Sequence, residues 1–473
     1  MSETSITEVP KCACDSIVDS NWLETARAVC TKDVSYQKDG KNYCVMHYPS
    51  KDKVEAFRVE LRNKLDSDSC SCSKYNFCGV YFPEDIHFDT YKKPCENSFS
   101  FNTGAHFGFA TFSGLADFNR VIFENKAVFG DAKFEKNARF HFASFNAGTD
   151  FGKATFTGWV SFWAATFSVI TFFDSTKFLY KVNFQHAQFK EYVKFIRGDE
   201  EMFGKTASLE IDFLRIDIPE RQRLSFHSVK LRPNWFINSD SRKMEFIDVD
   251  WGNIKDELGS ELKSTQERLS SPNPPSGHEQ LSIVYKPLTM NANNLLSTTY
   301  RQLAVNAEEN SRYEEAMKFR YASMETSFLS SQKKWREDWS KQHCGKWSFE
   351  TFSWWWDVTL TNLFSLSWWY RTLSGYGESV TRAAIALLLI LFLSCVPYQF
   401  TGFAPSKYPE DKIGAPLPNV ARALVYSLET ASLQKPEPRP VTTAARFFVG
   451  LETILAPLQA ALLALAIRRK YMR

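Results

Sequence analysis

Phenylalanine recurs at alternating steps of five and six residues through the middle of the chain. The series begins at Phe107 and has a ring at every step up to Phe195, so the true period is eleven residues. A small or β-branched residue stands two positions before most rings, as in Ala110-Thr111-Phe112 and Val182-Asn183-Phe184. In an extended chain, residues two apart point to the same side. The pattern therefore predicts short strands with both side chains inward and polar corners between them.

An eleven-residue hydrophobic period can also indicate a right-handed helical supercoil. At about 100° per residue, however, Ala105, Phe107, Ala110 and Phe112 would be scattered around a helix and would form no common face. The helical alternative is therefore excluded. Stacked coils of short strands, with a ladder of rings inside, remain as the interpretation.

These small-x-Phe units resemble the pentapeptide-repeat proteins over about Phe101 to Phe195. The resemblance implies a right-handed, four-sided β-helix. Seventeen rings would then make roughly four coils, about 20 Å of rod. Weaker units continue through Leu224-Ser225-Phe226 to Val249-Asp250-Trp251, so we assign the β-helix to residues 96–255.

Two uncharged or nearly uncharged stretches near the C-terminus are long enough to cross a bilayer. They are Ala383 to Ser406 and Phe447 to Ile467, and the second is followed by the basic run Arg468 to Arg473. A basic end indicates the cytosolic side, and the N-terminus lacks the pattern of a secretory signal. We therefore predict a multi-pass protein of the cell inner (cytoplasmic) membrane, with lipid as a partner and both termini in the cytosol.

The segment between these two stretches has its own order of elements. Pro418 to Leu433 has helical periodicity and is followed by a proline-rich break at Gln434 to Pro440. A helix, a break and a return before the next span predict a re-entrant loop. Residues 380–473 thus resemble the two-transmembrane potassium-channel-like domain, with Lys435 to Arg439 in place of its filter motif. That resemblance implies a pore formed by a homo-oligomer, a tetramer by analogy.

Three residues of this domain are candidates for a pore or for contacts between subunits. A carboxylate in lipid is costly, so Glu452 and Glu429 are expected to face water, the interior of a helix bundle or a partner. The alternatives are an acid that reaches the nearby interface for Glu452 and a solvated loop residue for Glu429. Pro457 would kink the second span, as a gate hinge or simply as a packing feature.

Eight of the ten cysteines lie between Cys12 and Cys95, and in a reducing compartment such clustering favours metal binding. We assign residues 1–95 to a Cys-rich head, similar to the small heads in front of some pentapeptide-repeat membrane proteins. We predict a site for zinc as a structural cofactor. Its four ligands would be Cys14, Cys30, Cys44 and His47, with Cys12 as a substitute ligand. A second site would use Cys70, Cys72, Cys78 and Cys95.

Two further segments separate the β-helix from the membrane domain. Residues 256–345 form a linker, with a Pro- and Ser-rich connector at 270–277 and a hairpin of helical runs at Tyr300–Asn306 and Tyr313–Leu329. Residues 346–379 contain two clusters of tryptophan and predict an interfacial aromatic helix. The fold class is therefore multidomain: a β-helix, a helical linker and an α-helical two-span membrane domain.

Composition and motifs exclude several functions. The net charge is only +3, and the repeats contain no acidic excess that would mimic DNA, so we expect no nucleic-acid partner. No catalytic motif has its expected context, and His106, His141 and His186 fall near corners of the repeat, where we expect surface positions. The leading hypothesis is an ion-channel-like pore with a cytosolic sensing solenoid, and not an enzyme. The alternatives are a membrane-tethered scaffold that binds a protein partner, and a membrane-disrupting defence effector.

Overall fold

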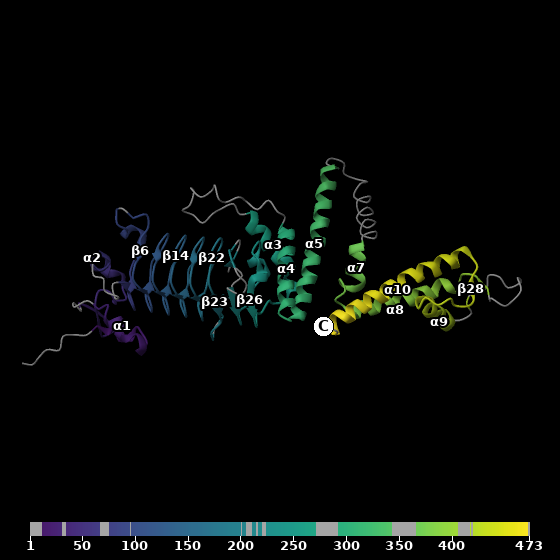
Figure 1. Ribbon diagram of the computed structural model, residues 1–473, viewed down its shortest axis with the longest axis horizontal. Helices are drawn as coiled ribbons and strands as arrows, with labels where there is room; N and C mark the ends of the chain where they lie inside the picture. Colours follow the sequence, from purple (N-terminus) through teal and green to yellow (C-terminus); the bar gives the residue numbers. More distant parts are fainter. Residues whose placement is uncertain are drawn as a thin grey trace, which may run out of the picture. The chain divides into compact units, whose positions relative to one another are not determined.

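A computed structural model describes most of the chain, in two compact units of residues 1–311 and 312–473 (Figure 1). The described residues are 12–30, 35–66, 75–94, 96–199, 201–204, 211–213, 216–219, 224–270, 292–342, 366–404, 417 and 420–471. Of the predicted connector at 270–277, only the first residue is described. The first tryptophan cluster, Trp354 to Trp356, lies outside the described residues. Each unit is described by itself.

The first unit begins with a small head of short elements. Its longest helix, α2 (Val54–Asp66), buries Phe57, Leu61 and Leu65 on one face. The spacing of these residues is that of an amphipathic helix. The other elements are η1 (Ala13–Ser16), η2 (Ser20–Trp22), α1 (Leu23–Arg27), the antiparallel pair β1 (Tyr36–Lys38) and β2 (Lys41–Tyr43), and η3 (Lys51–Lys53).

Four parallel sheets form the sides of a β-solenoid. In the regular part, each strand pairs with the strand 22 residues further on, as in Phe112↔Phe134↔Phe156. Twenty-two residues are two of the eleven-residue periods, so one coil has four sides, as the resemblance implied. Parallel stacking satisfies the backbone groups of each inner coil by the coils above and below it.

The strands of the four sheets are short, mostly two residues each. Two sheets have five strands: β6 (Ser100–Phe101), β10 (Ile122–Phe123), β14 (Ser144–Phe145), β18 (Thr166–Phe167) and β22 (Gln188–Phe189); and β4 (Tyr81–Phe82), β8 (Thr111–Phe112), β12 (Lys133–Phe134), β16 (Thr155–Phe156) and β20 (Lys177–Phe178). The third has six: β5 (Ile86–His87), β9 (Ala116–Asp117), β13 (Ala138–Arg139), β17 (Val160–Ser161), β21 (Val182–Asn183) and β24 (Ile211–Asp212). The fourth has eight: β3 (Tyr75–Asn76), β7 (Ala105–His106), β11 (Ala127–Val128), β15 (Thr149–Asp150), β19 (Thr171–Phe172), β23 (Val193–Ile196), β25 (Leu224–His227) and β26 (Met244–Ile247).

The predicted ladder of rings fills the solenoid. Phe129, for example, stacks between Phe107 and Phe151 with ring centroids 5.0 and 4.8 Å away. The small residues two positions earlier, such as Ala105 and Ala127, are fully buried beside the rings. The inward assignment of both positions in each small-x-Phe unit is confirmed.

Two sequence expectations for the solenoid differ from the structure. Its strands begin at Tyr75, ahead of the boundary placed at residue 96. The seventeen rings from Phe107 to Phe195 do make about four coils, as estimated, because paired strands there lie 22 residues apart. The expectation of a surface position for His141 is also wrong, because the side chain is buried with its ring against Trp159 and Trp163. The weak units at Phe226 and Phe246 do belong to the ladder.

Helices cover the last rung of the solenoid. The described helices at this end are α3 (Ile254–Ser270) and α4 (Ala292–Glu309), with η5 (Pro233–Phe236) and η6 (Ser241–Lys243) in the loops between the last strands. At the other end of the solenoid, η4 (Phe88–Tyr91) follows β5 in the first coil. The buried side-chain amide of Asn306 on α4 donates to the carbonyls of Ser241 and Met244 at 3.1 and 2.7 Å. This contact protects an end that would otherwise leave a sheet open to pairing with another chain.

The second unit is helical. It contains α5 (Tyr313–Gln342), α7 (Leu366–Ser374), α8 (Val380–Tyr398), α9 (Val420–Ala431) and α10 (Thr443–Tyr471), with the antiparallel pair β27 (Phe403–Ala404) and β28 (Arg439–Pro440). The helical runs predicted from Tyr300 and from Tyr313 are both present, as α4 and α5, and they belong to different units. The second tryptophan cluster lies on α7.

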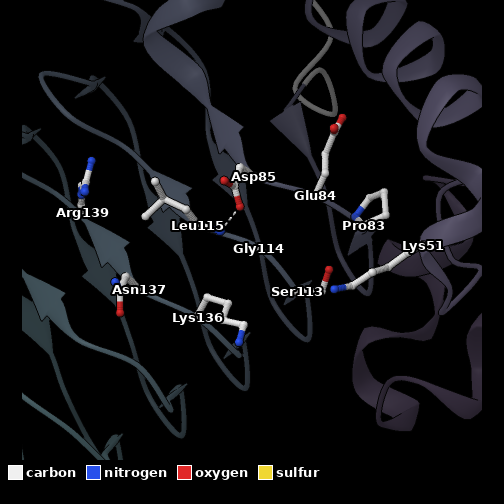
Figure 2. Close-up of a pocket in the computed structure, with 10 residues that line it drawn as sticks. All are labelled: Lys51, Pro83, Glu84, Asp85, Ser113, Gly114, Leu115, Lys136, Asn137 and Arg139. Atoms are coloured by element: carbon white, nitrogen blue, oxygen red, sulfur yellow. Dashed lines mark hydrogen bonds between the residues drawn. The ribbon is translucent and has the colours of Figure 1, made fainter.

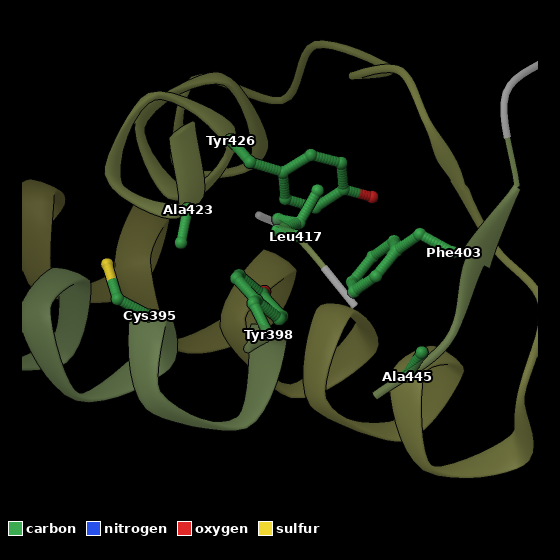
Figure 3. Packing of buried hydrophobic residues seen from close by; sticks show 7 residues of the cluster. All are labelled: Cys395, Tyr398, Phe403, Leu417, Ala423, Tyr426 and Ala445. Atoms are coloured by element: carbon green, nitrogen blue, oxygen red, sulfur yellow. The ribbon is translucent and has the colours of Figure 1, made fainter. Parts of the chain in front are cut away.

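Among the described residues, α8 and α10 are the helices long and apolar enough to cross a membrane. They lie side by side, and α9 packs against both. The core between them contains Tyr398, Phe403 and Tyr426, whose rings meet at 5.1 to 5.7 Å (Figure 3). Large apolar side chains on the outer faces, such as Leu388 and Phe392 on α8, are exposed. Such faces are suited to contact with lipid or with further helices.

Candidate functional site

Four potential metal ligands meet in the head. Cys12 precedes η1, Cys30 follows α1, and Cys44 and His47 lie in the turn after β2. One ligand atom from each lies within 4.8 Å of all the others. Three of these side chains are buried and that of Cys30 is half-buried. The sequence brings them together because a short hairpin places the Cys44-x2-His47 turn against the start of the head.

The distances fit a tetrahedral ion. Nδ1 of His47 lies 3.8 Å from the Sγ of Cys12, 3.6 Å from that of Cys30 and 3.1 Å from that of Cys44. Zinc–sulfur and zinc–nitrogen bonds of ordinary length put these atoms about 3.6 Å apart at tetrahedral angles. Three thiolates and one imidazole with no open position are the ligand set of a closed, structural zinc site.

Groups outside the cluster orient its ligands. Nε2 of His47 lies 3.1 Å from the carbonyl oxygen of Cys78, and since a carbonyl only accepts, Nε2 carries the proton. In the neutral ring that binds a metal, this proton position leaves the lone pair of Nδ1 facing the thiols. The backbone N–H of Cys44 donates to the Sγ of Cys12 at 3.3 Å, which stabilises a thiolate there.

Contacts within the cluster shift the pKa values of its ligands. Hydrogen bonding with Cys14 raises the pKa of Cys12, but Cys30 and Cys44 lower it, and the net pKa of Cys12 is about 5. Burial acts to lower the pKa of His47, while its contacts with Cys12 and Cys44 raise it to about 9. A thiol that ionises easily is suited to a metal, because the ligand must be deprotonated when the ion binds.

The four-residue group differs from the predicted set at one position. It contains Cys12, which was predicted as the substitute, where Cys14 was placed among the four ligands. Cys14 is buried next to the group, with its Sγ 3.6 Å from that of Cys30. Of the second predicted site, Cys70, Cys72 and Cys95 lie outside the described residues. Cys78 is buried, and burial raises the pKa of its thiol to about 12.

The acid predicted in the second span lies inside the helix bundle. Glu452 on α10 is only 2% exposed, and both of its carboxyl oxygens accept hydrogen bonds. The donors are the hydroxyl of Tyr398 on α8 and that of Ser427 on α9. Ser427 also lies 3.1 Å from the carbonyl oxygen of Leu391 on α8. One carboxyl group thus joins three helices of the same chain. Glu452 therefore has the position inside the bundle that was expected because a carboxyl group exposed to lipid is costly.

The other two candidates in this domain are less enclosed. Glu429 is half-buried on α9, and its carbonyl oxygen accepts from the backbone of Gln434. Pro457 is half-buried within α10. Sequence reasoning missed Tyr398, Ser427 and also Gln459, a buried amide of α10 that donates to the carbonyl of Ala383 at 2.9 Å. The sequence did contain a signal for Gln459, because it is a polar residue within an otherwise apolar span.

A groove of about 560 Å³ runs along one corner of the solenoid beside the head (Figure 2). Gly114 lies in its wall, where a Cβ would come within 2.4 Å of the backbone of Glu84. The cations in the lining are Lys51, Lys136 and Arg139, and the acids are Glu84 and Asp85.

Both acids of this groove already have partners, and the cations are less well satisfied. Glu84 receives two hydrogen bonds from Arg58, at 2.6 and 2.5 Å, and Asp85 accepts from the backbone N–H of Leu115 at 2.7 Å. Nη1 of Arg139 lies 3.9 Å from the carboxylate of Asp117, and its Nε is buried without a hydrogen bond to the described residues. The groove is therefore suited to an anionic group.

Comparison of the chain with protein-family models, curated proteins and solved structures found no match.

Proposed function

We propose that this protein forms an ion-channel-like pore in a membrane, with the β-solenoid as a cytosolic sensing domain. The observation that supports this proposal most is the three-helix arrangement around Glu452. A short helix, α9, packs between two apolar helices, and a shared carboxyl group holds it there. The chain then returns through β28 to the second long helix, the order expected for a re-entrant loop.

The outer faces of the three helices support assembly of several copies. Val420, Leu424, Val425 and Leu428 lie on one exposed face of α9, opposite the face that Tyr426 and Ser427 bury. An apolar face on a helix between two spans calls for lipid or for another protein surface. We propose by analogy that the protein is a tetramer in the inner membrane with both termini in the cytosol. A right-handed coil of the solenoid and the absence of an enzymatic role are also proposals.

The position of Glu452 changes the role proposed for it. Its carboxyl is held inside one copy of the chain, so its role in a pore is to position α9 and not to line the path of the ion. Glu452→Gln keeps the size and one oxygen acceptor, whereas Glu452→Ala leaves the hydroxyl of Tyr398 without its acceptor and leaves Ser427 only the carbonyl oxygen of Leu391. The alanine variant should therefore disturb α9 much more than the glutamine variant.

Single-channel recording of the purified full-length protein in a planar bilayer tests the pore. We expect discrete openings that are altered by Glu452→Ala, and altered less by Glu452→Gln. Thr453→Ala, at an exposed neighbouring position of α10, is the control and should leave the openings unchanged. A silent bilayer with correctly inserted protein would contradict a pore, and large non-discrete leaks would favour the membrane-disrupting effector.

The groove of the solenoid favours a second candidate, a membrane-tethered scaffold. Its cations and the paired state of its acids suit an acidic segment of a protein partner. Lys136→Glu with Arg139→Glu should weaken binding of an acidic model peptide at least tenfold, and Lys133→Glu, on the neighbouring strand β12, serves as a control of equal charge change per residue. In a pure scaffold these changes abolish partner binding while conductance is absent throughout.

We further propose that the Cys12, Cys30, Cys44 and His47 cluster holds a structural zinc ion. The ligand set and the distances support zinc, which prefers four-coordinate sites of sulfur and nitrogen. Cys12→Ser should reduce the zinc content of purified full-length protein severalfold, whereas Cys14→Ser should keep it near one ion per chain. Equal loss in both variants, or no zinc in the wild-type protein after zinc titration, would contradict this assignment.

A further inference from the structure

A buried lysine lies directly behind the turn that carries two of the cluster's ligands. Lys53, at the end of η3, is only 1% exposed. Its ammonium donates to the carbonyl oxygens of Val45 and Met46, at 2.5 and 2.9 Å. Val45 and Met46 are the two residues between Cys44 and His47, so the cation is fixed to the back of the ligand turn.

The surroundings of this ammonium are mostly neutral. It lies over the rings of Phe57 and Tyr81, 4.9 and 5.5 Å from their centroids. No salt bridge within the described part of the chain joins it to a carboxylate. Burying an ammonium costs several kcal/mol unless a negative charge lies close by, since ring and carbonyl dipoles offset only part of the lost hydration.

Burial lowers the pKa of Lys53 to about 7 and outweighs the thiol groups of Cys44 and Cys12, which act in the opposite direction. Because the ammonium is fixed to the two residues between Cys44 and His47, the thiolates of the cluster are the anions on its side of the head. Three thiolates, a neutral imidazole and a divalent ion carry one net negative charge. The charge on Lys53 would neutralise that centre.

We infer that Lys53 is the buried counter-ion of the metal centre, and that the centre is built for a divalent ion bound by three thiolates. This inference rests on the proposed zinc site and adds a positioning residue to it. Lys53 fixes the Cys44–His47 turn through its two carbonyls and offsets the charge of the loaded centre. The ion in turn stabilises the buried ammonium, so metal binding and the charge at position 53 depend on each other.

The same turn joins the head to the solenoid. The carbonyl of Met46 accepts the backbone N–H of Tyr81 at 3.0 Å, and Cys78, whose carbonyl holds His47, belongs to the same first coil. On the neighbouring side of that coil, the amide of Asn76 donates to the carbonyl of Thr25 at 2.8 Å. A loaded, neutral centre therefore stabilises the cap over the first rung of the β-solenoid.

Zinc affinity of the full-length protein, measured by competition with a chromophoric chelator, tests the counter-ion. Lys53→Met keeps the length of the side chain and removes the charge, so we expect affinity to fall about 10- to 100-fold. Thermal unfolding of the chelator-treated protein should change little, because the variant no longer buries an ammonium. The matched control is Lys51→Met, an exposed lysine two residues earlier, which should keep wild-type affinity.

Two results would overturn the inference. Unchanged zinc affinity in a folded Lys53→Met variant would show that the ammonium only clamps the turn, as would equal destabilisation of the zinc-free and zinc-loaded forms. If Lys53→Met does not fold, Lys53→Arg decides: affinity within about threefold of wild type supports a counter-ion, and a 100-fold loss contradicts it. Absence of zinc binding in the wild-type protein would instead remove the metal centre itself.

Discussion

The guanidinium of Arg371 on α7 lies 2.5 Å from the carboxylate of Glu325 on α5. Glu325 also accepts a hydrogen bond from the hydroxyl of Tyr376 at 3.2 Å, and the carbonyl of Tyr376 accepts from Arg469 near the end of α10 at 2.9 Å. Tyr376 is held in a turn of three consecutive left-handed residues, between two glycines. Within the second unit, these contacts connect α5 to the basic end of the second apolar helix.

Glu325→Ala should destabilise the second unit, because Arg371 and Tyr376 lose their shared acceptor. We expect a loss of about 1–3 kcal/mol in the free energy of unfolding, and not more, since Arg371 remains partly in water. Thermal unfolding in detergent, followed by circular dichroism, measures it. Glu314→Ala removes an exposed acid of the same helix and should cost less than about 0.5 kcal/mol. Equal effects of the two variants would show that this connection contributes nothing.

The Phe172-Phe173 pair allows a matched test of the solenoid core. Phe173 is fully buried, with its ring stacked between those of Phe151 and Phe195 at 5.0 and 4.6 Å, whereas Phe172 is half-buried on the outside of β19. Phe173→Ala should cost about 3–5 kcal/mol of folding free energy. Phe172→Ala should cost clearly less, about 1 kcal/mol.

Urea unfolding of the full-length protein, monitored by tryptophan fluorescence, measures both variants. Similar midpoints for Phe172→Ala and Phe173→Ala would contradict the assignment of alternate residues to the inside and the outside of the coil.

The helices that cover the last rung should make stability depend on pH. Glu261 on α3 is 4% exposed, and burial raises its pKa to about 7, although the hydroxyl of Tyr300 at 2.5 Å acts to lower it. The folded state therefore holds the proton more tightly than the unfolded state, whose ordinary value is 4.5. The stabilisation is complete below about pH 4.5 and is lost as the pH rises through about 7, with a total of about 3 kcal/mol.

Glu261→Gln stays neutral at every pH and should remove this dependence. Unfolding free energies of both proteins at pH 5 and pH 8 measure the difference. Glu267→Gln, at an exposed position of the same helix, should keep the wild-type dependence. Parallel pH profiles for wild type and Glu261→Gln would contradict a titration of Glu261 in this range.

The repeat could be predicted because its period is local. Each ring and its small partner lie within three residues of one another. The five- and six-residue steps therefore show which side chains point into the coil, without knowledge of contacts elsewhere in the chain. The first coil was missed because Phe77, Phe82 and Phe88 are followed by a longer segment before Phe99, which interrupts the steps. A repeat is recognised by its spacing, and an insertion hides it even where the stacking is kept.

The sites were less predictable, because they depend on contacts between distant residues. Cys12 and Cys14 are the same type of residue and stand only two positions apart in the sequence. Their backbones distinguish them, because Cys12 is extended before η1 whereas Cys14 lies within it. The link between Glu452 and Tyr398 joins residues 54 positions apart, and that to Ser427 joins residues 25 apart. Lys53 reads in the sequence as one of several surface lysines. Its burial follows from the way the head packs on the solenoid.

The topology of the two apolar helices tests the central claim most directly. In the proposed arrangement, the loop after α9 lies outside the cytosol, whereas nine of the ten cysteines are cytosolic and Cys395 lies within α8. A membrane-impermeant maleimide applied to intact spheroplasts should label Lys435→Cys and leave the wild-type protein unlabelled until lysis. Labelling of the wild type in intact spheroplasts, or labelling of Lys435→Cys only after lysis, would contradict a protein that crosses the membrane twice with both ends in the cytosol.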